Sequence, residues 1–227
     1  MTKVKIKIFK AVDKPDLTKQ IFLQHENRLA RSNIKITSLS KEYLSSSDTI
    51  LICAIDISNN EILGSIRIQF HNNINPLPLE AGIKTFDPTI STYIANLAKN
   101  HTVVESCGLW CVKGKVVRNL SIAFRLYTLS IALCRYLKIE YCLGFVPKHT
   151  LNSCIKAGFQ FCEAYPEAFQ YPSKKFSSYV LESHPLENNK LEKNTQVYSD
   201  SFNEDPNFTE IVNIDNTDYI IQHEILL

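Results

Sequence analysis

The stretch VVESCGLWCVKGKVVRNLSIAFRLYTLSIALCRYL, residues 103–137, decides the fold class, because it holds two elements and the turn between them. Its first ten residues are mostly apolar and predict a strand over 103–112. Residues 113–119 carry three basic side chains and predict a loop. From 120 to 137, leucines and isoleucines recur at steps of three and four residues, which predicts a long amphipathic helix.

A basic loop that leads into a helix is suited to binding anions, because the first turn of a helix has free N–H groups and the positive end of the dipole. Arg118 stands at the predicted helix start, after Lys113 and Lys115. Ser121 and Ala123 are small, so a phosphate could approach the backbone there. The loop therefore suits a pyrophosphate or a phosphopantetheine, while a solvated basic turn before a core helix would use the same residues.

The rest of the chain alternates between the two element types. Strands are predicted at 4–8, 49–57, 62–70, 141–146 and 176–182, and helices at about 15–30, 91–98 and 147–157. This order predicts an α/β (α+β) domain over residues 1–184, with a mixed sheet flanked by helices. The composition then becomes polar, so 185–227 is expected to be a linker and C-terminal tail, with a short strand or docking segment at 219–227.

Composition narrows the functional classes. The net charge of +2 gives no sequence-wide case for nucleic acid or an anionic membrane as partner. No apolar run approaches the roughly 18 residues of a membrane span, and the first residues lack the apolar core of a secretory signal. The seven cysteines form no CxxC pair, which suits reduced thiols in a cytoplasmic protein, and no Cys/His spacing resembles a metal ligand set.

Residues 118–123 resemble the acyl-CoA signature of the GNAT acyltransferases, a Gln/Arg-x-x-Gly-x-Gly/Ala loop. Arg118, Ser121 and Ala123 occupy the three motif positions, with serine in place of the central glycine. The later stretch NSCIKAGF, from Asn152, and the hairpin that contains Gly64 are also similar to the family. The resemblance covers about residues 4–182. It implies a mostly antiparallel sheet in which the fourth and fifth strands splay apart around the pantetheine.

A narrower resemblance is to the autoinducer synthase branch, which comprises acyl-homoserine-lactone synthases and N-acyl amino acid synthases. The insert at 71–101 is long, Arg67 lies in the third strand and Glu105 opens ESCGLWCV, whereas Gly108 replaces an arginine of that branch. The resemblance implies acyl transfer from acyl-CoA, acetyl-CoA or an acyl carrier protein to the primary amine of a small molecule. Alternatives are acetyl transfer to an amino acid, antibiotic or protein, and a catalytically degenerate CoA-binding module.

The candidate catalytic residues are Glu105, Arg67 and Cys154. Glu105 is an acidic residue in an apolar strand, hence a candidate base or a strand-end glutamate paired to a lysine. Arg67 is a candidate anchor for a substrate carboxylate or a partner of Glu105. Cys154 stands where the resemblance places a general-acid tyrosine, and a plain buried cysteine is the alternative. The candidate cofactor-binding residues are Leu109, Trp110, Cys111, Val112, Lys113, Arg118, Asn119, Ser121, Ala123 and Asn152; Asp48 and Phe22 are candidate substrate contacts, and no metal is expected.

Overall fold

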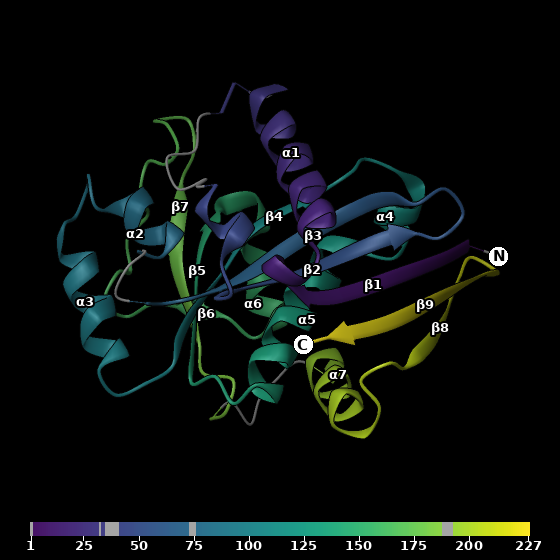
Figure 1. Ribbon diagram of the computed structural model, residues 1–227. Helices are drawn as coiled ribbons and strands as arrows, with labels where there is room; N and C mark the ends of the chain where they lie inside the picture. The colour runs from purple at the N-terminus through teal and green to yellow at the C-terminus, as the bar shows by residue number, and fades with distance from the viewer. Residues whose placement is uncertain (1, 32, 35–40, 73–75, 188–192) are drawn as a thin grey trace.

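The computed structural model describes residues 2–31, 33–34, 41–72, 76–187 and 193–227. These residues form one nine-stranded sheet in the order β6-β7-β5-β4-β3-β2-β1-β9-β8 (Figure 1). The strands are β1 (Thr2–Lys10), β2 (Thr49–Asp56), β3 (Glu61–Phe70), β4 (Val103–Cys111), β5 (Tyr141–Pro147), β6 (Gln160–Phe161), β7 (Ser178–Ser183), β8 (Thr209–Ile214) and β9 (Thr217–Leu226). The helices are α1 (Pro15–Arg31), α2 (Pro78–Ile83), α3 (Thr89–Ala98), α4 (Lys115–Asn119), α5 (Ile122–Tyr136), α6 (Leu151–Ala157) and α7 (Lys193–Glu204), with short 3-10 turns η1 (Ala11–Asp13), η2 (Glu42–Ser45) and η3 (Lys148–Thr150).

The sheet is mostly antiparallel, which confirms the predicted mixed α/β architecture. Only the neighbours β1–β9 and β4–β5 run parallel among the strands described. Both faces of the central strands are covered, so β2 is apolar along nearly its whole length. Ile50 and Ile52 pack in the core beneath α5, whereas Leu51 and Cys53 pack in the core beneath α1.

Strands β4 and β5 part after a short paired stretch, as the resemblance predicts. They pair only over Val103–Glu105, opposite residues 141–143. On the other edge of β4, Gly108 and Leu109 together face the single β3 residue Ile66, a β-bulge. Gly108 has a φ of +66°, which glycine adopts without strain. The bulge turns β4 away from β5, and a gap opens between them.

The segment between β4 and α5 differs from the predicted loop. Residues 115–119 form the short helix α4, and the long helix begins at Ile122. Ser121 joins the two with a φ of 48° and a ψ of 46°, a left-handed conformation that is unusual for a residue with a side chain. It is the position at which the resembling motif has glycine, the residue that adopts this conformation without strain.

The C-terminal residues differ from the expected linker. Residues 193–204 form α7, and β8 and β9 form a hairpin whose second strand pairs in parallel with β1. Helix α7 packs on α5 through Tyr198 and Phe202. Its buried side chains also include Thr195 and Ser199, so the helix has a buried face although its sequence is largely polar. The predicted segment at 219–227 corresponds to most of β9.

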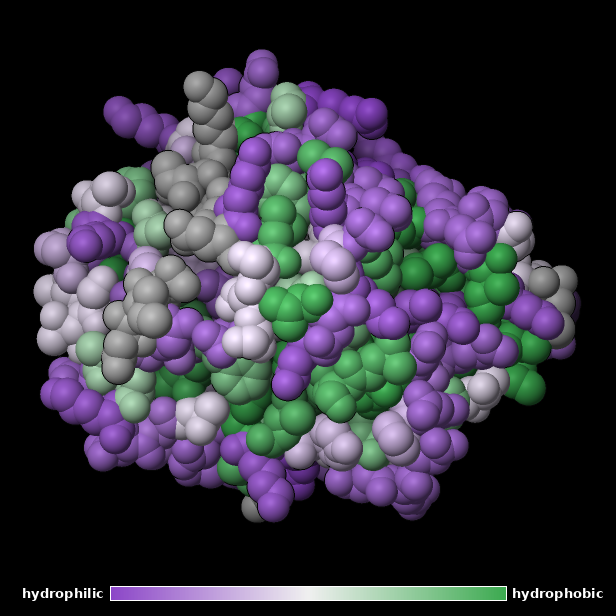
Figure 2. All heavy atoms as spheres, in the orientation of Figure 1, coloured by the Kyte–Doolittle hydropathy of each residue, from purple (hydrophilic) through white to green (hydrophobic). Residues whose placement is uncertain are grey.

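The surface around the C-terminal hairpin is mixed in character. Figure 2 shows a largely hydrophilic face, with hydrophobic side chains gathered towards its middle and lower part, where Figure 1 has β9 and α7, and at its right-hand edge. Val197 on α7 and Ile211 on β8 are among the exposed large hydrophobic side chains. Among the described residues, no helix combines the length and the apolar character that crossing a bilayer requires.

Candidate functional site

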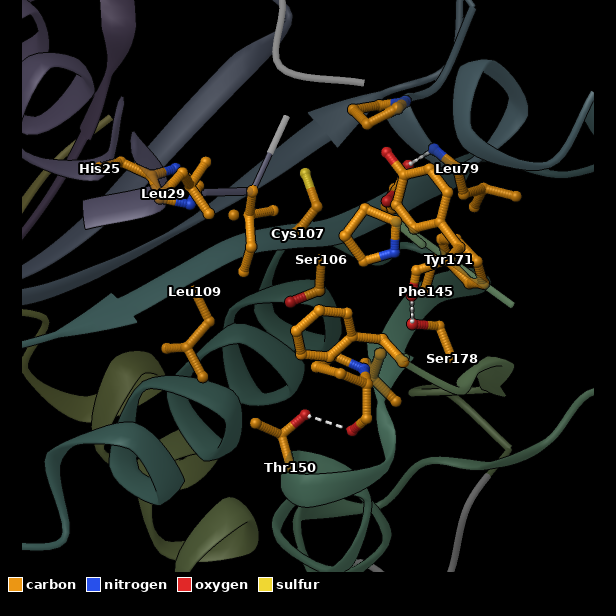
Figure 3. Close-up of a pocket in the computed structure, with 18 of the residues that line it drawn as sticks. His25, Leu29, Leu79, Ser106, Cys107, Leu109, Phe145, Thr150, Tyr171 and Ser178 are labelled. Carbon is orange, nitrogen blue, oxygen red and sulfur yellow. Dashed lines mark hydrogen bonds between the residues drawn. The ribbon is translucent and has the colours of Figure 1, made fainter. Parts of the chain in front are cut away.

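A cavity of about 280 Å³ lies at the gap between β4 and β5. Its walls come from β3, β4 (105–109), β5 (145–147), α1, α5, η3, the start of α2 and residues between 171 and 178. In Figure 3, His25 and Leu29 stand on one side of it, and Leu79, Phe145 and Tyr171 stand on the other. The cavity therefore reaches both faces of the sheet, and one wall of it is largely apolar.

Glu105 lies on the wall of this cavity and is almost fully buried, with 2% of its surface exposed. Its Oε2 accepts a hydrogen bond of 2.7 Å from the backbone N–H of Leu79, in the first turn of α2. That N–H has no partner within its own helix, so the carboxyl also positions α2. Burial raises the pKa of Glu105 to about 8; the Leu79 N–H and Arg67 oppose this rise, and Glu80 adds to it. A carboxyl with a pKa near the working pH suits proton transfer.

Arg67 is also buried and lines the cavity, with 5% of its surface exposed. Its guanidinium lies 4.3 Å from the ring centre of Tyr43, and its Nε donates to the Cys107 sulfur at 3.1 Å. Among the described residues, no carboxylate lies within 4.0 Å of it, so the ion pair with Glu105, one of the two alternatives for Arg67, is not formed. A buried cation held by a ring and a thiol can still accept an anion from a ligand.

His25 joins this group from α1, and the sequence reasoning missed it. A methyl group built on Gly108 would lie 3.7 Å from both His25 Cε1 and Arg67 Nη1. Burial, with Arg67 and Arg28 nearby, lowers the pKa of His25 to about 4, so the ring is neutral at pH 7. The signal in the sequence was its spacing from Ile21 and Phe22, which places it on the buried face of α1.

The helix side of the cavity carries Tyr127, Thr150 and the predicted residue Cys154. Tyr127 and Thr150 line the cavity, whereas Cys154 lies behind them with no exposed surface. The Tyr127 hydroxyl lies beside the Cys154 thiol and the Thr150 hydroxyl. Burial raises the pKa of the Cys154 thiol to about 12, although Tyr127 and Thr150 oppose the rise. The thiol therefore faces Tyr127, not the cavity. Tyr127 was missed because it lies beside the apolar stripe that identified α5.

No protein-family model matches this chain, and no curated protein matches it in sequence. Solved structures do match. FeeM, an N-acyl amino acid synthase from uncultured soil microbes, is similar with a TM-score of 0.58 at 13% identity, over 87% of this chain and 99% of that one. MesI, a CoA-dependent acyl-homoserine lactone synthase, gives 0.54 at 9% identity, over 86% and 95%. BjaI, a CoA-dependent acyl-homoserine lactone synthase solved with SAM and isopentyl-CoA, gives 0.53 at 13%, over 88% and 90%.

The chain has the GNAT fold. At these identities the likeness is one of fold, and the matched structures include enzymes of the autoinducer synthase branch that the sequence resembles. The parted strands β4 and β5 are the ones that the resemblance predicts to splay apart, and the cavity lies where they part.

The motif residues of the GNAT signature lie at the head of α5. Arg118 and Ser121 are exposed and Ala123 is half-buried, while Lys113 is exposed just before α4. Asn119 donates through Nδ2 to the Tyr219 hydroxyl on β9 at 2.8 Å, so it ties this segment to the C-terminal hairpin. Lys113, Arg118 and Ser121 are therefore accessible to a phosphate, whereas the Asn119 side chain already has a hydrogen-bond partner within the protein.

The remaining predicted residues divide between the cavity and other places in the GNAT fold. Leu109 lines the cavity. Trp110 lies below Arg28 on the α1 face, 5.0 Å from its guanidinium, in the same core as Phe22. Asp48 accepts a hydrogen bond of 2.8 Å from Asn72. Cys111 and Val112 pack partly buried against the core, and Asn152 is exposed on α6.

Proposed function

We propose that the protein is an N-acyltransferase that moves an acyl group from a CoA thioester to the primary amine of a small molecule that also carries an anionic group. The observation that supports this most is that Glu105 and Arg67 line one cavity in the gap between β4 and β5. Among the described residues, Arg67 has no carboxylate partner. The fold likeness to enzymes of this class supports it further.

The thioester would enter from the α5 side. Beyond Glu105, β4 has no strand partner on its β5 edge, so backbone groups near Leu109 are available to the pantetheine and to the oxygen of the tetrahedral intermediate. Arg118, Ser121 and the first turn of α5 would hold the phosphates. An acyl carrier protein presents the same phosphopantetheine and is the second candidate donor.

The acceptor would bind on the α1 side. Arg67 would hold its anionic group, and Glu105 would take a proton from the amine. The amine nitrogen attacks the thioester carbon, the C–N bond forms, the C–S bond breaks, and the sulfur keeps the electron pair. The carboxyl of Glu105 returns its proton to the solvent before the next turnover.

The apolar wall of the cavity favours an acyl group longer than acetyl. Leu79, Phe145 and Tyr171 line this wall, and Gly82 of α2 leaves room for the last two. Thiol release from a series of acyl-CoA thioesters, from acetyl to decanoyl, should therefore rise with chain length before it falls. Acetyl-CoA far ahead of the others would indicate an N-acetyltransferase. Tight CoA binding with no thiol release from any pair of donor and amine would indicate a binding module and contradict the proposal.

The phosphate site has a separate test. Calorimetry should show that Arg118→Glu weakens CoA binding by about tenfold or more, because a charge-assisted hydrogen bond is lost and a repulsion is added. Lys19→Glu is the matched control: it is an equal charge change at an exposed residue of α1, on the opposite face of the sheet. Equal affinity in the two variants would remove Arg118 from the site.

A further inference from the structure

Two uncharged side chains, Tyr43 and Cys107, fix the orientation of Arg67. Cys107 is the cross-strand partner of Arg67 on β4, and its sulfur accepts the 3.1 Å hydrogen bond from Arg67 Nε. The Tyr43 ring, carried by η2, lies against the guanidinium, with its centre 4.3 Å from the guanidinium carbon. A guanidinium is planar, so one contact at its Nε and one at its face together set the direction of the whole group.

The Nη1 end of the guanidinium lies beside the bulge in β4. A methyl group built on Gly108 would lie 3.7 Å from Arg67 Nη1 and 3.7 Å from His25 Cε1, and no other described atom would be closer. Arg67, His25 and Cys107 all line the cavity (Figure 3). Because glycine has no side chain, the space next to Nη1 is open to a ligand.

The ionisable side chains that act on Arg67 carry no charge at neutral pH. Burial raises the pKa of Tyr43 and that of Cys107 to about 12, although Arg67 opposes both rises. Glu105, with a pKa of about 8, is mostly protonated at pH 7, and His25, with a pKa of about 4, is neutral. Among the described residues, the positive charge of Arg67 therefore has no counterion, and the cavity wall keeps a net positive charge.

We propose that Tyr43 and Cys107 are positioning residues for the acceptor, which orient Arg67 without neutralising it and so make the site select an amine that carries an anion. The inference rests on the proposed function, in which Arg67 holds the anionic group. An acidic side chain in the place of Cys107 would bind Arg67 more strongly, but it would cancel the charge that attracts the acceptor. A ring and a thiol hold the guanidinium in one orientation and leave its charge to the ligand.

The first test is Cys107→Asp, compared with Cys107→Ser. Octanoyl-CoA is supplied with an equimolar mixture of amino acids and their decarboxylated amines, and mass spectrometry gives the ratio of the two sets of N-acyl products. A serine hydroxyl still accepts from Nε, so Cys107→Ser should keep the wild-type ratio to within about threefold. Cys107→Asp should lower the ratio by about tenfold or more, because the new carboxylate pairs with Arg67. KM for octanoyl-CoA should be unchanged in both.

The second test is Tyr43→Leu, compared with Tyr43→Phe. Tyr43 is not among the residues that line the cavity, so we expect it to affect the acceptor only through Arg67. Leucine removes the aromatic face, and Tyr43→Leu should lower the product ratio by about fivefold, whereas Tyr43→Phe keeps the face and should keep the ratio. If Cys107→Asp does not fold, this pair of variants decides the question.

The outcomes separate this inference from the proposed function. A wild type that acylates both sets of amines equally, or neither set, would overturn the proposed function and the inference with it. If the wild type prefers the amino acids and Cys107→Asp or Tyr43→Leu keeps that preference, the residue concerned has no positioning role and only the inference is overturned. Slower transfer to both sets alike, or an equal loss of preference in Cys107→Ser and Cys107→Asp, would show a structural role and overturn it as well.

Discussion

Two polar clusters, one at the gap between β4 and β5 in the middle of the sheet and one beside its β9–β8 edge, are satisfied in opposite ways. The cavity cluster is Glu105, Arg67 and His25. The C-terminal cluster is Arg125, Tyr198, Glu210 and His223. In the C-terminal cluster, Glu210 Oε1 accepts from Arg125 Nη1 at 2.6 Å, lies 2.8 Å from His223 Nε2 and accepts from the Tyr198 hydroxyl at 3.1 Å. In the cavity cluster, the described residues place no carboxylate within ion-pair distance of Arg67.

The electrostatics follow from this difference. The pKa of Glu210 is lowered, because His223 and Arg125 outweigh the burial that would raise it. The pKa of Glu105 is raised to about 8, because burial outweighs its partners. A buried charge without a partner destabilises a fold, and such groups persist mostly where a ligand completes them. The C-terminal cluster therefore links the hairpin to α5, whereas our proposal assigns the cavity cluster to a substrate.

The largest expected effect is on turnover. Glu105→Gln should lower kcat by about 10²–10⁴-fold with acyl-CoA binding kept, because the amine loses its base. Glu210→Gln, measured well below its melting temperature, should stay within about threefold of the wild type. Steady-state thiol release for both variants measures this. Similar losses in the two would mean that the clusters do not differ in role.

The second effect is on stability, where we expect Glu210→Gln to cause the larger loss and Glu105→Gln the smaller. Glu210→Gln should lower the free energy of unfolding by about 1–3 kcal/mol, because charge-assisted hydrogen bonds from Arg125 and His223 are lost. Glu105→Gln should leave it unchanged or raise it, since the amide oxygen still accepts from Leu79 and folding at pH 7 no longer requires the uptake of a proton by this side chain. Urea unfolding at pH 7 measures both. If Glu105→Gln lowered the free energy of unfolding and Glu210→Gln did not, the two clusters would have the opposite roles to those described.

The third effect is a pair of opposite pH trends. The folded-state pKa of Glu105, about 8, exceeds its ordinary value of 4.5, so the folded protein binds more protons between these values. Its contribution to stability is complete below pH 4.5 and is lost as pH rises through 8. The pKa values of Glu210 and His223 are lowered, so their contribution is present at neutral pH and is lost in acid.

Urea unfolding at pH 5.5 and pH 8.5 separates these trends. Relative to Glu105→Gln, the wild type should lose at least about 1.4 kcal/mol between the two values, which is one pKa unit. Below pH 5, the wild type should approach the stability of Glu210→Gln. Parallel pH curves for the wild type and Glu105→Gln would show that the Glu105 carboxyl is not perturbed.

The smallest effect is at Ser121, which starts the helix that carries Arg125. Ser121→Gly should raise the free energy of unfolding by about 0.5–1 kcal/mol, because glycine adopts the left-handed conformation without strain. Ser153→Gly, inside α6, is the control and should lower it by a similar amount. The gain should be equal at pH 5.5 and 8.5, since no charge changes. A pH-dependent gain would mean that Ser121 couples to one of the clusters.

The sequence predicted what local periodicity can encode. The apolar β2 and β3 and the stripe along α5 gave the central sheet and its covering helix, and Arg67 and Glu105 stood out because charges are rare in such strands. The cavity was harder, because it joins His25, Glu105 and Thr150 from distant elements. Helix α7 was not predicted, because its buried face contains the polar residues Thr195 and Ser199. The sequence there lacks the regular apolar spacing that identifies an amphipathic helix.

The expected substrate contacts at Phe22 and Asp48 show the same limit. Phe22 lies on a helix that lines the cavity, yet its side chain packs into the core with Tyr43, and His25, one turn later, reaches the cavity. Asp48 bonds Asn72 and is not among the residues that line the cavity. Element positions were therefore predicted more reliably than the direction of each side chain, because that direction depends on neighbours that are far away in the sequence.

The most direct test of the central claim is product formation by the wild-type protein. The protein would be incubated with octanoyl-CoA and an equimolar mixture of amino acids and their decarboxylated amines, and the products identified by mass spectrometry. The account predicts N-acyl products from the carboxylate-bearing members, in amounts equal to the thiol released, and their loss in Arg67→Met. Equal acylation of both sets, or no N-acyl product, would contradict it.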